Sequence, residues 1–219
     1  MRLAVHRSVS GLLILALATV APAVSRVTVA EDTGDESLET FRERFLQDFD
    51  RIGMNSPYED ALFLRILIQG MEAWQGLEIG SANGYGAIHM GIGFERHGGT
   101  LTTLDIDPGM VRQCRDNVAR AKLDKVVTCL EGDALKLIPT LEGEFDFVFI
   151  DASKRDYLRY FQALEPKLAP GAVIVAHNAV AFAGAMRDYL DHVAPGGDYD
   201  TVIVRTNDQD GMAVSYRKR

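Results

Sequence analysis

The sequence predicts a doubly wound α/β domain, in which helices cover both faces of a mostly parallel seven-stranded sheet. Short apolar segments alternate five times with segments of helical pattern, which is the order of a parallel sheet with right-handed crossovers. The tail departs from this order. Residues 201–204 and 212–216 are strand-like and are joined by the polar turn 207–211, so the sheet is expected to end in an antiparallel C-terminal strand.

The first 30 residues have the three parts of an export signal. A basic start with Arg2 and Arg7 precedes an apolar run over residues 9–24, and small residues follow as far as Ala30. The run is shorter than the roughly 20 apolar residues that span a membrane comfortably, so a cleaved signal peptide is favoured over an anchor. We therefore predict an exported protein, periplasmic or tethered to the membrane through residues 9–24. The alternative is a cytoplasmic protein whose start is assigned too far upstream.

A short linker is expected to separate this segment from the folded domain. Residues 31–37 are acidic and polar, which leaves 38–219 as the domain. Its first helix is indicated by Phe41, Phe45 and Phe49, because a spacing of four residues keeps side chains on one helical face.

A second helix is predicted to begin at Ser56-Pro57 and to end near Gly70. Ser56 is expected to cap the helix, proline suits the first helical position, and Glu59 completes a capping box. The alternating segments then follow. Strands are predicted at residues 77–79, 101–104, 126–130, 145–150 and 172–176, and helices at 84–96, 108–121, 134–141 and 154–168.

The loop after the first of these strands is rich in glycine, which allows a sharp turn and close approach to a ligand. A dinucleotide-binding fingerprint needs glycine at i, i+2 and i+5. That pattern fails from Gly80 and from Gly84, which disfavours a nicotinamide-dependent oxidoreductase. Glycines at 80, 84 and 86 after the acidic Glu78 instead match the first motif of S-adenosylmethionine-dependent methyltransferases.

Polar residues also follow the other parallel strands, whose carboxyl ends share one edge of the sheet. Asp105 ends the second strand and suits the two hydroxyls of a ribose. Asp133, after the third, either accepts a hydrogen bond from an adenine amino group or only caps the next helix. Asp151 and Lys154 follow the fourth strand and His177-Asn178 the fifth, so a carboxylate, an amine, an imidazole and an amide are expected around one crevice.

The charge composition indicates which class of molecule the protein binds. The net charge is −8, and without the three arginines of the first 30 residues the chain keeps 20 basic and 31 acidic side chains. This balance argues against nucleic acid and favours a small-molecule ligand. Cys114 and Cys129 are expected to pack as two small apolar residues, and a single bridge between them stays open if the chain is exported.

From about Ser56 to the C-terminus, the chain resembles the cation-dependent O-methyltransferases, which include catechol and caffeoyl-CoA O-methyltransferases. The resemblance is carried by residues 77–80 with Gly84-Tyr85, by residues 145–157 and by residues 173–178. It implies a Rossmann-like, class I enzyme that transfers a methyl group from S-adenosylmethionine to a hydroxyl of a small catechol-like or phenolic acceptor. Many members of the family form homodimers.

The resemblance also assigns roles to single positions. It implies that Asp151 and Asn178 bind a divalent metal, and that Lys154 is the base that removes the acceptor's hydroxyl proton. It places the cofactor against residues that end the first four strands or begin the loops and helices after them: Glu78, Gly80, Ser81, Gly84, Gly86, Asp105, Asp133, Ala134 and Asp151.

Two positions depart from the family pattern. Gly86 stands where members carry Ser or Thr, and His177 stands where they carry a metal-binding Asp. The metal set becomes Asp151, His177 and Asn178, with one negative charge fewer. Mg²⁺ prefers oxygen ligands, whereas imidazole suits Zn²⁺, Fe²⁺, Ni²⁺ or Cu²⁺. The alternatives are therefore a softer ion, a weak Mg²⁺ site, no metal with His177 as catalytic base, or a cofactor-binding protein without turnover.

Overall fold

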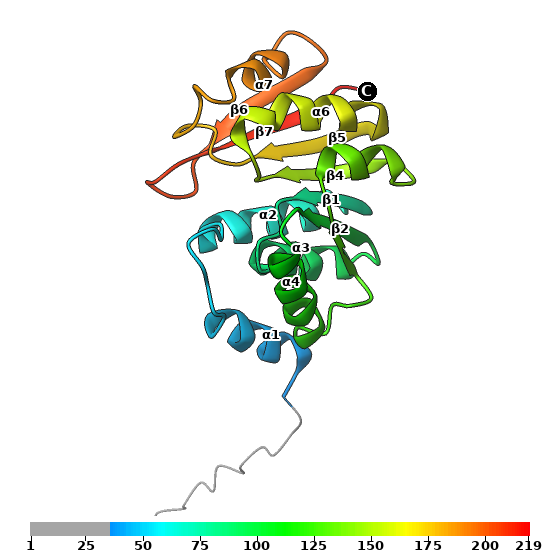
Figure 1. The fold of residues 1–219 in the computed structure, drawn as a ribbon, viewed down its shortest axis with the longest axis vertical. Helices are drawn as coiled ribbons and strands as arrows, with labels where there is room; N and C mark the ends of the chain where they lie inside the picture. Colours follow the sequence, from blue (N-terminus) through cyan, green and yellow to red (C-terminus); the bar gives the residue numbers. More distant parts are fainter. Residues whose placement is uncertain (1–35) are drawn as a thin grey trace, which may run out of the picture. The chain divides into compact units, whose positions relative to one another are not determined.

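The computed structural model describes residues 36–219, and Ser37–Arg219 form one compact unit (Figure 1). The predicted export segment, and all of the predicted linker except its last two residues, lie outside the described part. Within residues 36–219, no helix combines the length and the apolar character needed to span a membrane.

A seven-stranded sheet forms the middle layer. Its order is β3-β2-β1-β4-β5-β7-β6, and β7 runs antiparallel to both of its neighbours while β1 to β5 are parallel. The predicted mostly parallel sheet with an antiparallel C-terminal strand is therefore confirmed. The strands are β1 (Gln75–Ile79), β2 (Thr100–Asp105), β3 (Val127–Glu131), β4 (Phe145–Ile150), β5 (Leu168–Ala176), β6 (Tyr199–Val204) and β7 (Met212–Arg217).

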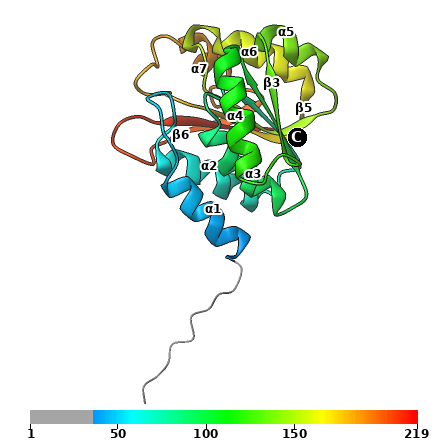
Figure 2. The ribbon, with the colours of Figure 1, turned by 60° about the horizontal axis from the view of Figure 1, so that its bottom comes forward.

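Helices cover both faces of this sheet, with α2, α3 and α4 on one side and α6 and α7 on the other (Figures 1 and 2). Alternate side chains of β4 supply both cores. Phe147 and Phe149 belong to the first apolar cluster, and Val148 and Ile150 to the second. The helices are α1 (Leu38–Gln47), α2 (Tyr58–Gly70), α3 (Tyr85–Glu95), α4 (Pro108–Arg120), α5 (Ala134–Leu137), α6 (Tyr157–Leu164) and α7 (Arg187–His192).

The start of α2 corrects one prediction. No side chain caps this helix, and Pro57 precedes it instead of occupying its first turn. The hydroxyl Oγ of Ser56 lies 3.4 Å from Oδ2 of Asp151, so this side chain faces the crevice at the strand ends instead of the helix.

Other helix boundaries in the structure differ from the predicted ones for identifiable reasons. The helix predicted at 134–141 is a single α-helical turn that continues as a 3-10 turn, Ile138–Thr140, around Pro139. The helix predicted at 154–168 is α-helical only over α6, with 3-10 turns on both sides. Helix α7 was not predicted, because six residues are too few to establish a helical period.

Candidate active site

A pocket of about 1230 Å³ opens at the carboxyl ends of the parallel strands. The order of the sheet reverses between β1 and β4, and open α/β sheets bind ligands beside such a reversal. The volume exceeds the roughly 300–1,000 Å³ of an ordinary ligand pocket, so it suits a cofactor together with a second molecule. Of the predicted site residues, eight line it: Gly80, Asp105, Asp133, Ala134, Asp151, Lys154, His177 and Asn178.

Gly80 turns the chain from β1 into this pocket. Its φ is +101°, in the region that favours glycine, and an added Cβ would lie 2.2 Å from the carbonyl oxygen of Asp151. The backbone N–H of Gly80 donates to the carbonyl of Leu104 at 2.8 Å, which ties the loop to β2. Only glycine therefore allows β1 and β4 to present their ends side by side.

Four predicted residues support this loop from behind and do not line the pocket: Glu78, Ser81, Gly84 and Gly86. Glu78 is 1% exposed, and an added Cβ at Gly86 would lie 3.0 Å from its Oε1. The glycine that replaces the family's Ser or Thr thus makes room for this carboxyl group. Burial raises the pKa of Glu78 to about 8, although the hydroxyl of Thr103 donates a hydrogen bond to it.

Two aspartates hold the loops on the far side of the pocket. Oδ2 of Asp105 accepts the N–H of Ala82 at 2.9 Å, and its Oδ1 accepts the N–H of Asp107 at 2.9 Å. Asp105 thereby fixes the glycine loop while facing the cavity. Asp133 caps α5, since its Oδ1 accepts the N–H of Leu135 at 3.0 Å, and it lines the cavity as well.

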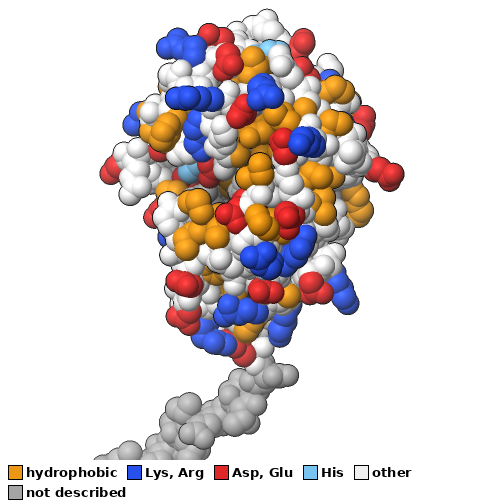
Figure 3. Space-filling model, in the orientation of Figure 1, with side chains coloured by type: hydrophobic (Ala, Val, Ile, Leu, Met, Phe, Trp, Pro, Cys, Tyr) orange, Lys and Arg blue, Asp and Glu red, His pale blue; other side chains and the backbone are white. Residues whose placement is uncertain are grey.

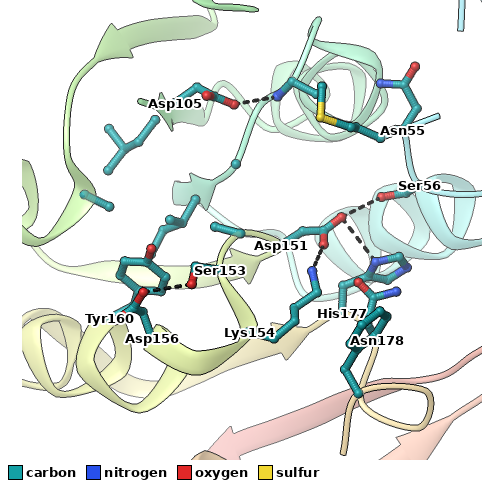
Figure 4. Close-up of a pocket in the computed structure, with 18 of the residues that line it drawn as sticks. Asn55, Ser56, Asp105, Asp151, Ser153, Lys154, Asp156, Tyr160, His177 and Asn178 are labelled. Atoms are coloured by element: carbon teal, nitrogen blue, oxygen red, sulfur yellow. Dashed lines mark hydrogen bonds and ion pairs between the residues drawn. The ribbon is translucent and has the colours of Figure 1, made fainter. Parts of the chain in front are cut away.

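The other predicted residues converge around Asp151 (Figure 4). Nζ of Lys154 lies 2.7 Å from its Oδ1, and Nδ1 of His177 lies 3.1 Å from its Oδ2. Burial opposes the ionisation of Asp151, but the contacts with His177 and Lys154 outweigh it and lower the pKa of this carboxyl group. Three of the four groups expected around one crevice are therefore in direct contact.

His177 has a second partner that the sequence did not reveal. Its Nε2 lies 2.8 Å from Oδ2 of Asp60, on α2, and both side chains are buried. Oδ1 of Asp60 accepts the hydroxyl of Thr206 and Nδ2 of Asn207, the latter at 2.9 Å. A faint signal existed, because Asp60 precedes Leu64 and Ile68 at helical spacing and so lies on the core face of α2.

The two ring nitrogens of His177 differ. Nδ1 is buried, has no assigned hydrogen-bond partner within the described residues, and lies 3.1 Å from Oδ2 of Asp151. Burial opposes the charged ring, yet Asp151 and Asp60 together raise the pKa of His177 to about 9.

Asn178 completes the cluster beside His177 (Figure 4). Its φ is +60°, and its Nδ2 donates to Oδ2 of Asp210 at 2.8 Å. Asp210 also accepts backbone N–H groups from Val180 and Ala181, which fixes the turn after β5. Since the amide nitrogen is held, the amide oxygen is the polar atom of Asn178 that remains for a ligand.

Comparisons with known proteins agree with this architecture. A family model described as O-methyltransferase matches residues 27–195. The catechol O-methyltransferase of Niastella koreensis is 37% identical over 122 residues, which are 54% of this chain and 55% of that protein. The catechol O-methyltransferase of Mycobacterium tuberculosis is 34% identical over 144 residues, 65% of this chain and 62% of the relative. The matched region thus spans little more than half of the first relative's length.

Solved structures share the fold. The cofactor-bound Rv0187 protein from MTB superposes with a TM-score of 0.72 at 26% identity, covering 85% of this chain and 92% of that one. An O-methyltransferase from Bacillus cereus in complex with SAH also gives a TM-score of 0.72, at 23% identity, and covers 85% and 93% of the two chains.

Proposed function

The chain belongs to the O-methyltransferase family, and we propose that it transfers the methyl group of S-adenosylmethionine to a hydroxyl oxygen of a small phenolic or catechol-like acceptor. The observation that carries this proposal is the pocket at the strand ends, which brings Lys154, Asp151 and His177 to one side and Asp105 and Asp133 to the other. One side suits an acceptor and the other a nucleoside.

The charge of the pocket supports a cationic cofactor. Seven acidic side chains line it, against four basic ones, Arg51, Lys154, Arg159 and His177. The sulfonium of S-adenosylmethionine is positive, so this lining favours it. The same lining disfavours a polyanionic acceptor such as a coenzyme A thioester, and supports a neutral phenol. On the face that Figure 3 shows, basic side chains are interspersed with acidic ones.

We assign different residues of the pocket to the ribose, the adenine and the methionine end of the cofactor. Asp105 accepts hydrogen bonds from the ribose hydroxyls, and Asp133 with Ala134 borders the adenine, since these residues line the pocket after β2 and β3. Gly80 lets the backbone approach the methionine end, and Glu78, Ser81, Gly84 and Gly86 shape that loop from behind. Asp151 lies between this end and the acceptor.

The protein's main tasks are then alignment and removal of a proton. The methyl group passes in line from sulfur to the acceptor oxygen, and alignment of two bound reactants lowers the barrier by roughly 7–11 kcal/mol. Lys154 is the base we assign to the hydroxyl proton, because its Nζ lies in the pocket, positioned 2.7 Å from Oδ1 of Asp151, and as a neutral amine it can accept that proton. Nδ1 of His177 faces Asp151 and is buried, so it reaches an acceptor less readily.

The family implies a divalent ion, and the donors of this pocket fit one. Among residues 36–219, Nδ1 of His177 is a buried polar atom without an assigned hydrogen-bond partner, Oδ2 of Asp151 lies 3.1 Å from it, and Asn178 keeps an amide oxygen. A bound ion would act as a Lewis acid that lowers the pKa of the acceptor hydroxyl.

The test is cofactor titration by calorimetry on the chain without residues 1–30, followed by methyl transfer to catechol measured by mass spectrometry. Lys154→Met is expected to lower the transfer rate by about 10²–10⁴-fold, the usual contribution of a general base, while the cofactor still binds. Lys136→Met on α5, outside the pocket, is the matched control. Cofactor binding without transfer to any phenol would favour a protein without turnover, and no cofactor binding would overturn the proposal.

A further inference from the structure

We propose that Asp60 is a positioning residue that orients His177 as a nitrogen ligand, so that the pocket prefers a first-row transition ion such as Mn²⁺ or Co²⁺ over Mg²⁺. The inference rests on the proposed function only in that the ion lies beside the acceptor. It concerns His177, which stands where the family carries Asp, and Asp60 of α2, which contacts it.

The hydrogen bond to Asp60 selects the tautomer of His177. A carboxylate only accepts hydrogen bonds, and Asp60 already accepts two from Thr206 and Asn207 on its other oxygen. The Nε2 of His177, 2.8 Å from Asp60, therefore carries the hydrogen. Metal-binding histidines almost always donate their second N–H to a carboxylate, carbonyl or water in this way, which leaves the other nitrogen as the ligand.

The other ring nitrogen, Nδ1, lies where a ligand should be, and an ion that binds there displaces any proton it carries. Nδ1 is buried, has no assigned hydrogen-bond partner in the described part of the chain, and lies 3.1 Å from Oδ2 of Asp151. Two ligands at right angles around an ion, with bonds of about 2.1 Å, lie about 3.0 Å apart. The observed separation thus matches neighbouring ligands of an octahedral ion better than those of a tetrahedral one, for which the separation is about 3.4 Å.

The third donor is equally constrained. Asp210 holds Nδ2 of Asn178 at 2.8 Å and so leaves the amide oxygen to the pocket. Within residues 36–219 no group of three or more His, Cys, Asp or Glu side chains is placed to hold an ion. The set is therefore one imidazole, one carboxylate and one amide, completed by water and acceptor oxygens. Affinity for such mixed nitrogen and oxygen donors rises from Mn²⁺ to Co²⁺ and Ni²⁺, whereas Mg²⁺ prefers oxygen.

The experiment is calorimetric titration of Mg²⁺, Mn²⁺ and Co²⁺ into the full chain, without cofactor or acceptor. Co²⁺ is also followed by its visible absorption, whose bands shift when a nitrogen ligand replaces an oxygen ligand. We expect Mn²⁺ and Co²⁺ to bind about tenfold or more tightly than Mg²⁺. Asp60→Asn is expected to weaken Co²⁺ binding by about 10–100-fold, as loss of an outer-shell partner does. Asp116→Asn on the exposed side of α4 is the matched control and should bind Co²⁺ as the wild type does.

His177→Asp supplies a second test, because it replaces the nitrogen ligand by an oxygen ligand. It should move the preference towards Mg²⁺ and shift the Co²⁺ absorption to that of an all-oxygen site, whether or not Asp60→Asn folds. Equal affinity for Mg²⁺ and Co²⁺ in the wild type would overturn the inference, as would no ion binding, which would mean that a proton on Nδ1 bridges His177 to Asp151 instead. Titration of S-adenosylmethionine into the same samples separates the two claims, since cofactor binding without ion binding leaves the proposed function standing.

Discussion

At the scale of single residues, the shape of the pocket depends partly on buried side chains that do not line it but pack behind the loops that do. Glu78 is the sharpest case, because its carboxyl group lies behind the glycine loop with almost no exposure. Thr103 donates a hydrogen bond to it, and Gly86 leaves the space that its Oε1 occupies. The resemblance assigns Glu78 to the cofactor, but in this structure its carboxyl group packs behind the glycine loop and supports it.

This burial predicts an unusual pH dependence. The pKa of Glu78 rises from 4.5 to about 8 on folding, so between these values the folded chain holds a proton that the unfolded chain has lost. Stability must then fall as the pH rises through this window. Glu78→Gln, which cannot ionise, should melt progressively higher than the wild type from pH 5 to pH 8 in the absence of cofactor. Exposed Glu144→Gln is the control, and parallel melting curves for Glu78→Gln and wild type would contradict the buried acid.

The cluster around His177 shows where sequence reasoning stops at this scale. Asp105, Asp133, Asp151 and Lys154 were predictable, because each follows a strand whose end had already been placed at one edge of the sheet. Asp60 was not, because it meets His177 across 117 residues of chain and is held there by packing of α2. Spacing along the sequence places Asp60 on the core face of α2 but does not identify His177 as its partner.

At the scale of elements, strands were easier to predict than helix ends. A strand buried on both faces is apolar at nearly every position, as β4 is, and this pattern needs no knowledge of its neighbours. The start of α2 was harder to predict, because the hydroxyl of Ser56 points to Asp151 and does not cap the backbone N–H groups of the helix. Competition between a local cap and a distant partner is a tertiary effect.

The packing of α1 rests on one buried arginine. Arg42 is 5% exposed, pairs with Glu95 of α3, and donates to the carbonyl oxygens of Ala121 at 2.9 Å and Lys122 at 2.8 Å. Its removal leaves the buried carbonyl group of Ala121 without a partner, which costs about 1–3 kcal/mol, whereas water can reach the carbonyl of the exposed Lys122.

Arg42→Met is therefore expected to lower the melting temperature by roughly 2–12 °C, at about 2–4 °C per kcal/mol for a domain of this size. The matched control is Arg96→Met, whose ion pair with Glu39 lies in solvent and contributes little. Calorimetric melting of both variants checks the prediction, and equal losses would show that Arg42 acts only as a surface charge.

At the scale of the whole molecule, the structure of the folded domain and the predicted export segment together determine whether Cys114 and Cys129 should form a disulfide. The two thiols are free and buried, and their sulfurs lie 3.1 Å apart between α4 and β3. In an oxidising compartment the pair can lose two protons and two electrons to a disulfide donor such as oxidised glutathione. The bond would close a loop of 15 residues, a length worth about 3 kcal/mol of stability.

If residues 1–30 direct export, the chain isolated from the periplasm should contain this disulfide, and the same chain made in the cytosol without residues 1–30 should not. Alkylation of free thiols followed by mass spectrometry distinguishes the two, and Cys114→Ser provides the reference for one remaining thiol. The oxidised form should also melt higher than the reduced form. Two alkylated thiols in exported protein would show that burial shields the pair from oxidants, and a chain found only in the cytosol would refute export itself.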